Sequence, residues 1–307
     1  MITVKPSYDV IIPVYHPGEK FSRVLSMLRA QTLKPSRIIL MQTVEEGEDV
    51  DIFPGCEVYR VLKKEFDHAA TRREGVILSS APYFLMMTDD AIPYDERMCE
   101  TLIYSLIRTG SAMCYARQVP ENGAGETERY TRLFNYPDTS FTKTAEDIGK
   151  LGIKAYFASD VCCAYDRKVY EENGGFIDHA IFNEDMIYAC KVLGTGKSVR
   201  YEASARVIHS HNYTPAQQFH RNFDLGMSQK MNPDVFSGIR SEGEGLKLVT
   251  GTMKHLIRKD RWYEIPKLIT DSAAKYAGYR LGKSYDRLPK KLSRKLSMNK
   301  TFCERYL

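Results

Sequence analysis

The 307-residue sequence lacks any stretch of 18 consecutive apolar residues, the length that a membrane-spanning helix requires. We therefore expect no transmembrane helix. The first residues, MITVKPSYDVIIPVY, lack the basic segment and apolar core of a signal peptide, so we expect a protein that is not exported. The sequence also lacks internal repeats and low-complexity linkers.

Cysteine is present, but without the spacing of a metal site. The seven cysteines lie at irregular positions, and no two of them form a CxxC motif. This pattern disfavours structural zinc and a disulfide framework, and it predicts reduced thiols in the cytoplasm. We expect the adjacent Cys162 and Cys163 to be small core residues.

Positive charge is concentrated near the C-terminus. Residues 254–307 contain 15 Lys and Arg against 5 Asp and Glu, whereas residues 1–253 contain 29 against 34. The imbalance predicts an anionic partner for this tail alone. Tyr276, Tyr279 and Tyr285 could stack nucleic-acid bases, but their helical spacing favours packing, so we expect no nucleic acid. We expect the tail to contact an anionic membrane surface, with Lys290, Lys291, Arg294 and Lys295 in the contact. The alternative is that Leu281, Leu288, Leu292 and Leu296 pack against the body of the protein.

Strands and helices alternate in the first half of the sequence. Apolar runs at 8–15, 36–43, 56–62, 83–88 and 112–119 predict buried strands. The segments 20–32, 69–81 and 96–110 have helical spacing. Strands separated by helices of this length predict βαβ units in an α/β fold, with a Rossmann-like, mostly parallel sheet.

The second half is less regular. Residues 120–155 are polar and predict a mobile, weakly helical region, and 158–176 predict a strand, a helix and a Gly-Gly turn. We expect a helix at 182–196, a strand at 205–214 that carries two histidines, and helices after about 215. These elements suggest a catalytic domain at 1–225, with halves at about 1–119 and 120–225, and a basic helical extension at 226–307.

Polar groups stand at the predicted carboxyl ends of strands, where ligands bind in open parallel sheets. Asp89 and Asp90 follow the run at 83–88. One carboxylate can bind Mg²⁺ or Mn²⁺, which can bridge a diphosphate, while the other accepts hydrogen bonds from a sugar hydroxyl. The alternative interpretation is an N-cap and turn before the helix at 96.

Three further groups have both a functional and a structural interpretation. The pair Glu184 and Asp185 can supply a general base or can cap a helix. His209 and His211 can bind a metal ion or can lie at a surface or in a packed site. Arg72 and its neighbour Arg73 follow FDHAAT, and one of them can pair with a base carbonyl or a phosphate.

The order of these motifs resembles family 2 glycosyltransferases of the GT-A fold. The segments that carry the resemblance are DVIIPVYHPGEKFSRVLSMLRAQTLKPSRIIL, FDHAATRREGV, TDDAIP, NED and HSHNYT. Within the family, FDHAATR, MTDDAIPYD, HSHNYTPAQQFHRNFDLG and YAGYRLGKSYDRLP are similar to segments of bacterial rhamnosyltransferases. The family resemblance covers about 8–225, and the resemblance to rhamnosyltransferases extends to about 290.

The resemblance implies roles for individual residues. It implies Asp90 and His209, with His211 as the alternative, as ligands of Mg²⁺ or Mn²⁺, and Asp89 as a contact to the ribose or the metal-bound diphosphate. It implies Asp185 as the base, with Glu184 beside it. The nucleobase contacts would be Pro13, Tyr15, Gln42 and Arg72.

Two positions depart from the family pattern. Gln42 stands where many relatives have an Asp that reads the pyrimidine ring, and Thr88 stands where the first acidic residue of the DxD motif is expected. The departures leave the identity of the base open, and they weaken the case for two carboxylate metal ligands.

The function implied is metal-dependent glycosyl transfer with inversion. The sugar would be L-rhamnose from dTDP-rhamnose, or another sugar from a UDP-sugar. The acceptor would be a glycan of a bacterial surface polysaccharide, either free or linked to a lipid, at the inner face of the cytoplasmic membrane. Nucleotidyltransferases usually carry a glycine-rich, basic phosphate-binding loop near the first strand. PVYHPGEKF has a single Gly and a single Lys there, which disfavours this class. A non-catalytic sugar-binding module is the other alternative.

Overall fold

The computed structural model describes residues 5–211, 213–238 and 242–307. Residues 1–4 of the N-terminal segment and Asn212 of HSHNYT lie outside this description. The chain divides into two compact units. Unit 1 comprises residues 1–119, 136–179 and 184–209, and unit 2 comprises residues 120–135, 180–183 and 210–307.

Unit 1 is built on a nine-stranded sheet in the described residues, with the order β3-β2-β1-β4-β8-β6-β9-β5 and with β7 beside β9. Strands β3, β2, β1 and β4 are parallel, as are β6 and β9, whereas β8 runs antiparallel to β4 and β6. The strands are β1 (Tyr8–Tyr15), β2 (Arg37–Val44), β3 (Glu57–Leu62), β4 (Tyr83–Met87), β5 (Ile92–Pro93), β6 (Met113–Val119), β7 (Phe141–Lys143), β8 (Cys162–Asp166) and β9 (Val199–Ile208).

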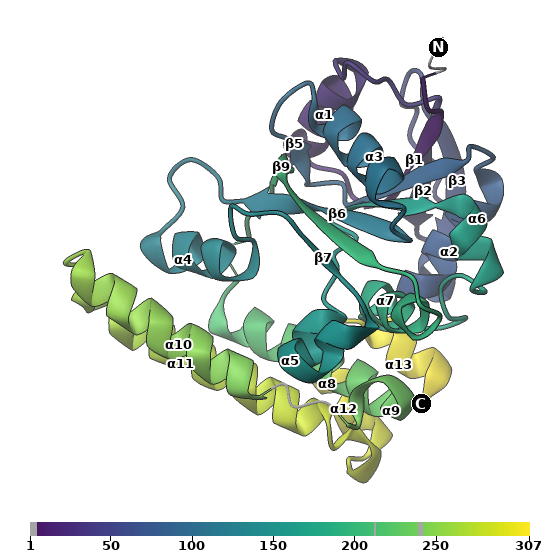
Figure 1. Cartoon of the computed structure of the whole chain (residues 1–307). Coiled ribbons are helices and arrows are strands. Elements are labelled where there is room, and N and C mark those ends of the chain that lie inside the picture. Colours follow the sequence, from purple (N-terminus) through teal and green to yellow (C-terminus); the bar gives the residue numbers. More distant parts are fainter. Residues whose placement is uncertain (1–4, 212, 239–241) are drawn as a thin grey trace. The chain divides into compact units, whose positions relative to one another are not determined.

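Helices cover both faces of this sheet (Figure 1). The helices of unit 1 are α1 (Glu19–Arg29), α2 (His68–Leu78), α3 (Met98–Thr109), α5 (Ile148–Leu151), α6 (Arg167–Glu172) and α7 (Glu184–Gly194). Side chains of α1 and α3 pack on Val10, Ile12 and Leu85. On the opposite face, α2 approaches so closely that a Cβ on Gly75 would lie 2.4 Å from Ile11 Cγ2. Burial on both faces explains why the strand sequences read as continuous apolar runs.

The structure corrects several expectations. The strand expected at 205–214 is Val199–Ile208, so both histidines follow the strand and do not lie on it. Residues 120–155, expected to be polar and weakly helical, contain the helix α4 (Glu126–Asn135) and also the strand β7, which was not predicted. The two-residue strand β5 was not predicted. Cys162 and Cys163 are core residues, as expected, with 1% and 0% of their surface exposed.

Unit 2 is helical in the described residues. Its helices are α4, α8 (Pro215–Met231), α9 (Pro233–Phe236), α10 (Glu242–Arg258), α11 (Ile265–Gly282), α12 (Lys290–Leu296) and α13 (Lys300–Tyr306). Helices α8 and α11 pack backbone to backbone at glycines: a Cβ on Gly278 would lie 2.2 Å from the Phe219 carbonyl oxygen. No helix in the described part of the chain is both long and apolar enough to cross a membrane.

Candidate active site

The carboxyl edge of the sheet brings distant segments together. Strand β8 begins beside the end of β4, because Met87 pairs with Cys162. The backbone N–H of Thr88 then donates to the Val161 carbonyl at 3.2 Å. The antiparallel β8 therefore places the residue before its start, Asp160, at the same edge as Asp89 and Asp90.

Asp89 and Asp90 form a turn directly after β4. Helix α3 begins at Met98 with Arg97 as its N-cap, so neither carboxylate caps that helix. Burial, followed by the negative charge of Asp90, raises the pKa of Asp89 to about 6, although a hydrogen bond from the Tyr15 backbone opposes the shift. Two partly buried carboxylates at a strand end form a place where a cation lowers the electrostatic energy.

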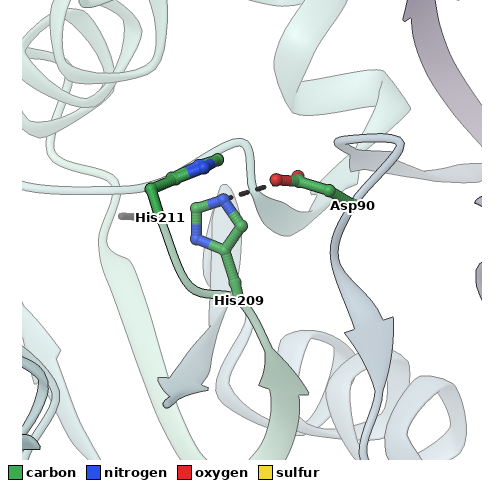
Figure 2. Close-up of side chains that lie close together, drawn as sticks. All are labelled: Asp90, His209 and His211. Atoms are coloured by element: carbon green, nitrogen blue, oxygen red, sulfur yellow. Dashed lines mark ion pairs between the residues drawn. The ribbon is translucent and has the colours of Figure 1, made fainter. Parts of the chain in front are cut away.

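Asp90 faces the imidazole of His209, which follows the end of β9 (Figure 2). Asp90 Oδ1 lies 3.4 Å from His209 Nε2. His211 lies two residues further on, and one ligand atom from each of the three residues lies within 4.8 Å of the others. The structure thus brings together Asp90, His209 and His211, the three residues predicted as metal ligands.

A buried amide orients His209. The Oε1 atom of Gln118 lies 2.8 Å from His209 Nδ1, and the Gln118 amide nitrogen donates to the Tyr136 hydroxyl at 2.6 Å and to Ser159 Oγ at 2.9 Å. An oxygen beside Nδ1 requires the hydrogen on that nitrogen, so in the neutral ring Nε2 carries the lone pair. Gln118 therefore leaves the lone pair of His209 Nε2 facing the Asp90 carboxylate, which is itself an acceptor.

This geometry fits a divalent cation. Two acceptors that face each other at 3.4 Å repel unless a cation or a second ring proton lies between them. Adjacent ligands of an octahedral ion with bond lengths of ~2.1 Å lie about 3 Å apart, close to the observed spacing. The mixture of carboxylate and imidazole suits Mn²⁺ better than Mg²⁺.

A second group of charges surrounds Arg72, which is 6% exposed. Its Nη1 lies 3.1 Å from Glu184 Oε1, and its Nε lies 3.4 Å from Asp160 Oδ2. Asp67 caps α2 through the backbone N–H groups of Ala69 and Ala70, and this helix start directs Arg72 toward the sheet edge. The guanidinium predicted to approach the nucleobase therefore lies among carboxylates, while Arg73 pairs with Asp178.

Asp185 lies beside this ion pair, in the first turn of α7. Its Oδ2 accepts from the Asp160 backbone N–H at 3.1 Å, and its Oδ1 accepts from Met186 N–H at 2.7 Å. Burial, then the charges of Glu184 and Asp160, raises the pKa of Asp185 well above its ordinary value. Burial likewise raises the pKa of Asp160 to about 7. A carboxylate with a raised pKa is suited to accept a proton near neutral pH.

The ends of β1 and β2 border an open hollow of about 550 Å³, which includes His16, Gln42 and Thr43. At this end of β1, Pro13 is half-buried, and Tyr15 is 40% exposed. The Gln42 amide donates to Asp51 Oδ2 at 2.7 Å and accepts from Asp51 N–H at 2.8 Å. The loop after β2 thus places an Asp directly beside Gln42.

Sequence reasoning missed three polar residues of this edge: Asp51, Gln118 and Asp160. Asp51 lies in a polar loop without a motif, and Asp160 precedes a strand whose antiparallel direction was not predicted. Gln118 sits within a predicted strand, and only a search for polar residues near the carboxyl ends of strands could have found it.

Solved structures show which fold this is. PcManGT, a mannosyltransferase from Pyrobaculum calidifontis in complex with GDP-Man and Mn²⁺, is similar with a TM-score of 0.55 at 13% identity, over 98% of this chain and 86% of that chain. S. aureus TarS 1–349 in complex with UDP is similar with a TM-score of 0.52 at 12% identity, over 92% and 91% of the two chains. The fold is that of GT-A glycosyltransferases, which confirms the expected fold class.

Sequence comparisons give the family. Residues 9–174 match the model of Glycosyl transferase family 2. The O-antigen chain rhamnosyltransferase RfbN of Salmonella typhimurium is 34% identical over 95% of this chain and 95% of its own length. WbaN of Salmonella anatum, also an O-antigen chain rhamnosyltransferase, is 32% identical over 97% and 96%. The chain belongs to glycosyl transferase family 2, is a glycosyltransferase, and is related to O-antigen rhamnosyltransferases, as its motifs predicted.

Proposed function

We propose that this enzyme transfers L-rhamnose from dTDP-L-rhamnose to a glycan acceptor in the synthesis of a bacterial surface polysaccharide. The observation that supports this most is similarity to two O-antigen chain rhamnosyltransferases over at least 95% of this chain and of each relative. Full-length coverage means that the relatives share the helical part as well as the nucleotide-sugar half. A UDP-sugar donor is the alternative.

On the donor side, we assign Asp90 and His209 as ligands of Mn²⁺ or Mg²⁺, with His211 as a further or alternative ligand. Their ligand-atom spacing supports this assignment, and the structural neighbour PcManGT was solved with Mn²⁺. The cation would neutralise charge on the departing nucleoside diphosphate, so no proton donor is needed there. Asp89 would contact the ribose or the diphosphate.

The hollow at the ends of β1 and β2 is proposed to receive the nucleobase. Pro13 and Tyr15, which lie at the end of β1 and are not among the residues lining the hollow, would flank the base, and Gln42 would present its amide to the pyrimidine edge. Because Asp51 holds both ends of this amide, the orientation of Gln42 is set before the donor binds. We propose that Arg72 acts by holding the carboxylates near Asp185, because its guanidinium lies between Asp160 and Glu184.

On the acceptor side, Asp185 would remove the proton from the attacking hydroxyl. Glu184 is engaged by Arg72, which leaves Asp185 as the better base of the pair. The hydroxyl oxygen would form a bond to the anomeric carbon on the face opposite the diphosphate, and the bond from that carbon to the diphosphate would break. This single displacement inverts the anomeric configuration.

We keep the proposed division into a catalytic domain at 1–225 and a basic helical extension at 226–307. The acceptor would be carried by a lipid at the cytoplasmic face of the membrane, which fits the concentration of positive charge in residues 254–307.

A donor panel tests this function. Purified enzyme, Mn²⁺ and an extract of lipid-linked glycans would be combined with dTDP-L-rhamnose, several UDP-sugars or GDP-mannose, and the released nucleoside diphosphate measured. Among these donors, we expect only dTDP-L-rhamnose to release its nucleoside diphosphate, and only when the acceptor is present. We expect no release with Asp185→Asn. Release from a UDP-sugar alone would replace the donor assignment, and release unaffected by Asp185→Asn would remove the proposed base.

A further inference from the structure

The connection between α10 and α11 exposes an aromatic and basic segment. All seven residues at 257–263, IRKDRWY, are exposed. Ile257 is 59%, Trp262 64% and Tyr263 55% exposed, and Trp262 is the only tryptophan of the sequence. Large apolar side chains that cluster at one exposed turn indicate a contact surface more strongly than scattered ones.

Defined hydrogen bonds hold this turn. Asp260 N–H donates to the Ile257 carbonyl at 3.2 Å, and Arg261 N–H donates to the Leu256 carbonyl at 2.8 Å. Asp260 adopts a left-handed conformation with φ of 55°, so these bonds form the Schellman ending of α10. Leu256 before the turn and Leu268 after it are buried. The exposure of Trp262 therefore belongs to a folded connection between two anchored helices.

Charges around the aromatic residues are mostly positive. Arg258, Lys259 and Arg261 surround a single acidic residue, Asp260. Arg261 bonds to Glu264 at 2.6 Å and lies over the Tyr263 ring, 5.1 Å from its centroid. Tryptophan and tyrosine favour the headgroup layer of a bilayer, where their rings meet both apolar chains and water. Adjacent arginine and lysine residues favour anionic lipids.

The other basic part of the tail, around α12, has some of its apolar surface packed within unit 2. Leu288, just before α12, and Leu296, the last residue of α12, pack against the core of unit 2 around Phe302. Arg294 of α12 pairs with Glu304. Leu292 of α12 is 39% exposed, so this helix offers a bilayer one exposed leucine, whereas the turn at 257–263 offers Ile257, Trp262 and Tyr263.

We propose that residues 257–263 dock unit 2 on an anionic lipid bilayer, with Trp262 and Tyr263 in the headgroup layer and Arg258, Lys259 and Arg261 beside lipid phosphates. The inference rests on the proposed function only for its purpose, which is to hold the enzyme near a lipid-linked acceptor. Lipid binding itself needs neither donor nor acceptor.

The single tryptophan makes the proposal directly measurable. Full-length protein would be mixed with vesicles of phosphatidylcholine alone or with added phosphatidylglycerol, and Trp262 fluorescence recorded. We expect a blue shift and quenching by lipids brominated near the headgroup, with the anionic vesicles only, and a loss of both as salt rises. Vesicle sedimentation without any spectral change would mean that another surface binds, and the proposal would be wrong.

Matched variants localise the contact. Each basic residue near an anionic surface contributes a factor of about five in affinity, so replacing Arg258, Lys259 and Arg261 by Gln should weaken vesicle binding on the order of 100-fold. The control replaces Lys290, Lys291, Arg294 and Lys295 by Gln, and we expect a smaller loss despite the larger charge change. The opposite order would place the docking site on α12.

Two further measurements separate the remaining outcomes. Tyr276→Ala, at another exposed ring (56%), should leave vesicle sedimentation unchanged, whereas Trp262→Ala should weaken it. A blue shift that depends on protein concentration without lipid would indicate a second copy as the occupant and would overturn the proposal. Donor turnover without vesicle binding contradicts this inference alone, whereas vesicle binding without turnover contradicts the proposed function alone.

Discussion

Arg72 Nη1 lies 3.1 Å from Glu184 Oε1, and this buried pair joins α2 to the start of α7. The guanidinium also faces Asp160, so one positive charge balances part of a group of three carboxylates that includes Asp185. Removal of one partner from such a buried group leaves uncompensated charge, which is costly. We therefore expect a substitution of Arg72 to affect turnover, because it disturbs the carboxylates beside the proposed base.

Arg72→Lys should lower turnover more than donor binding. Lysine keeps the charge but cannot span two carboxylates as the planar guanidinium does, so we expect kcat to fall by about tenfold or more while the Kd of dTDP-L-rhamnose changes little. Arg73→Lys is the control, because that side chain is more exposed and pairs with Asp178. If calorimetry shows that Arg72→Lys mainly weakens the donor, Arg72 belongs to the nucleotide site.

Asp185→Asn should abolish most turnover. The amide keeps the shape but cannot accept the proton of the acceptor, and we expect a loss on the order of 10²-fold or more. Donor affinity, measured by calorimetry with dTDP-L-rhamnose and Mn²⁺, should be nearly unchanged. An equal loss of donor affinity would place Asp185 on the donor side and leave the base unidentified.

The pH profile of kcat should respond to Glu184. The base must be deprotonated to act, so turnover rises with pH through the raised pKa of Asp185. The charge of Glu184 contributes to that raised pKa, so Glu184→Gln should lower the pKa and move the acidic limb to lower pH. Glu172→Gln, at an exposed site on α6, should not move it. A shift to higher pH with Glu184→Gln would contradict the electrostatic assignment.

Gln118→Leu should weaken Mn²⁺ binding without removing a metal ligand. The amide oxygen beside Nδ1 sets the tautomer of His209, and loss of such a partner typically costs 10- to 100-fold in metal affinity. Titration with Mn²⁺ followed by electron paramagnetic resonance measures this directly, and ¹⁵N NMR of His209 reports the tautomer. Ser159→Ala, which removes only one neighbour of the amide, is the milder control. Unchanged affinity and tautomer in Gln118→Leu would contradict the positioning role.

Gly278→Val should destabilise unit 2. A Cβ at position 278 would lie 2.2 Å from the Phe219 carbonyl oxygen, so α8 and α11 must separate, at a cost of about 1–3 kcal/mol. Gly245→Ala on α10 is the control, because nothing lies within 4 Å of its Cβ position, and alanine favours helix by up to about 1 kcal/mol. Urea unfolding compares the two variants; a Gly278→Val protein as stable as the wild type would mean that the helices are not in contact there.

Much of the fold followed from local pattern. The strand at 8–15 agrees with β1 at both ends because burial on both faces leaves a continuous apolar run with polar residues beyond it. The direction of β8 could not be predicted, because CCAYD has the same apolar pattern in either orientation. That direction places Asp160 beside the end of β4, where it faces Arg72. The carboxylates around Arg72 could therefore not be predicted either.

The histidines show the same limit. HSHNYT was expected on a strand, yet β9 ends at Ile208, and the alternation of a strand does not apply beyond its end. Similarly, the glycines of FDLG and YAGYRLG lie where the backbones of α8 and α11 touch, a contact that the sequence alone does not reveal. Contacts between segments that are distant in the chain determine these features, and such contacts cannot be predicted from a single sequence.

The most direct test of the central claim is to characterise the product formed from dTDP-L-rhamnose, Mn²⁺ and a lipid-linked glycan acceptor. Mass spectrometry should show the acceptor enlarged by one deoxyhexose, and NMR should show the new linkage with the anomeric configuration opposite to that of the donor. Enlargement by a different sugar from a UDP donor would contradict the rhamnosyl assignment. A linkage that retains the donor configuration would contradict single displacement with Asp185 as the base.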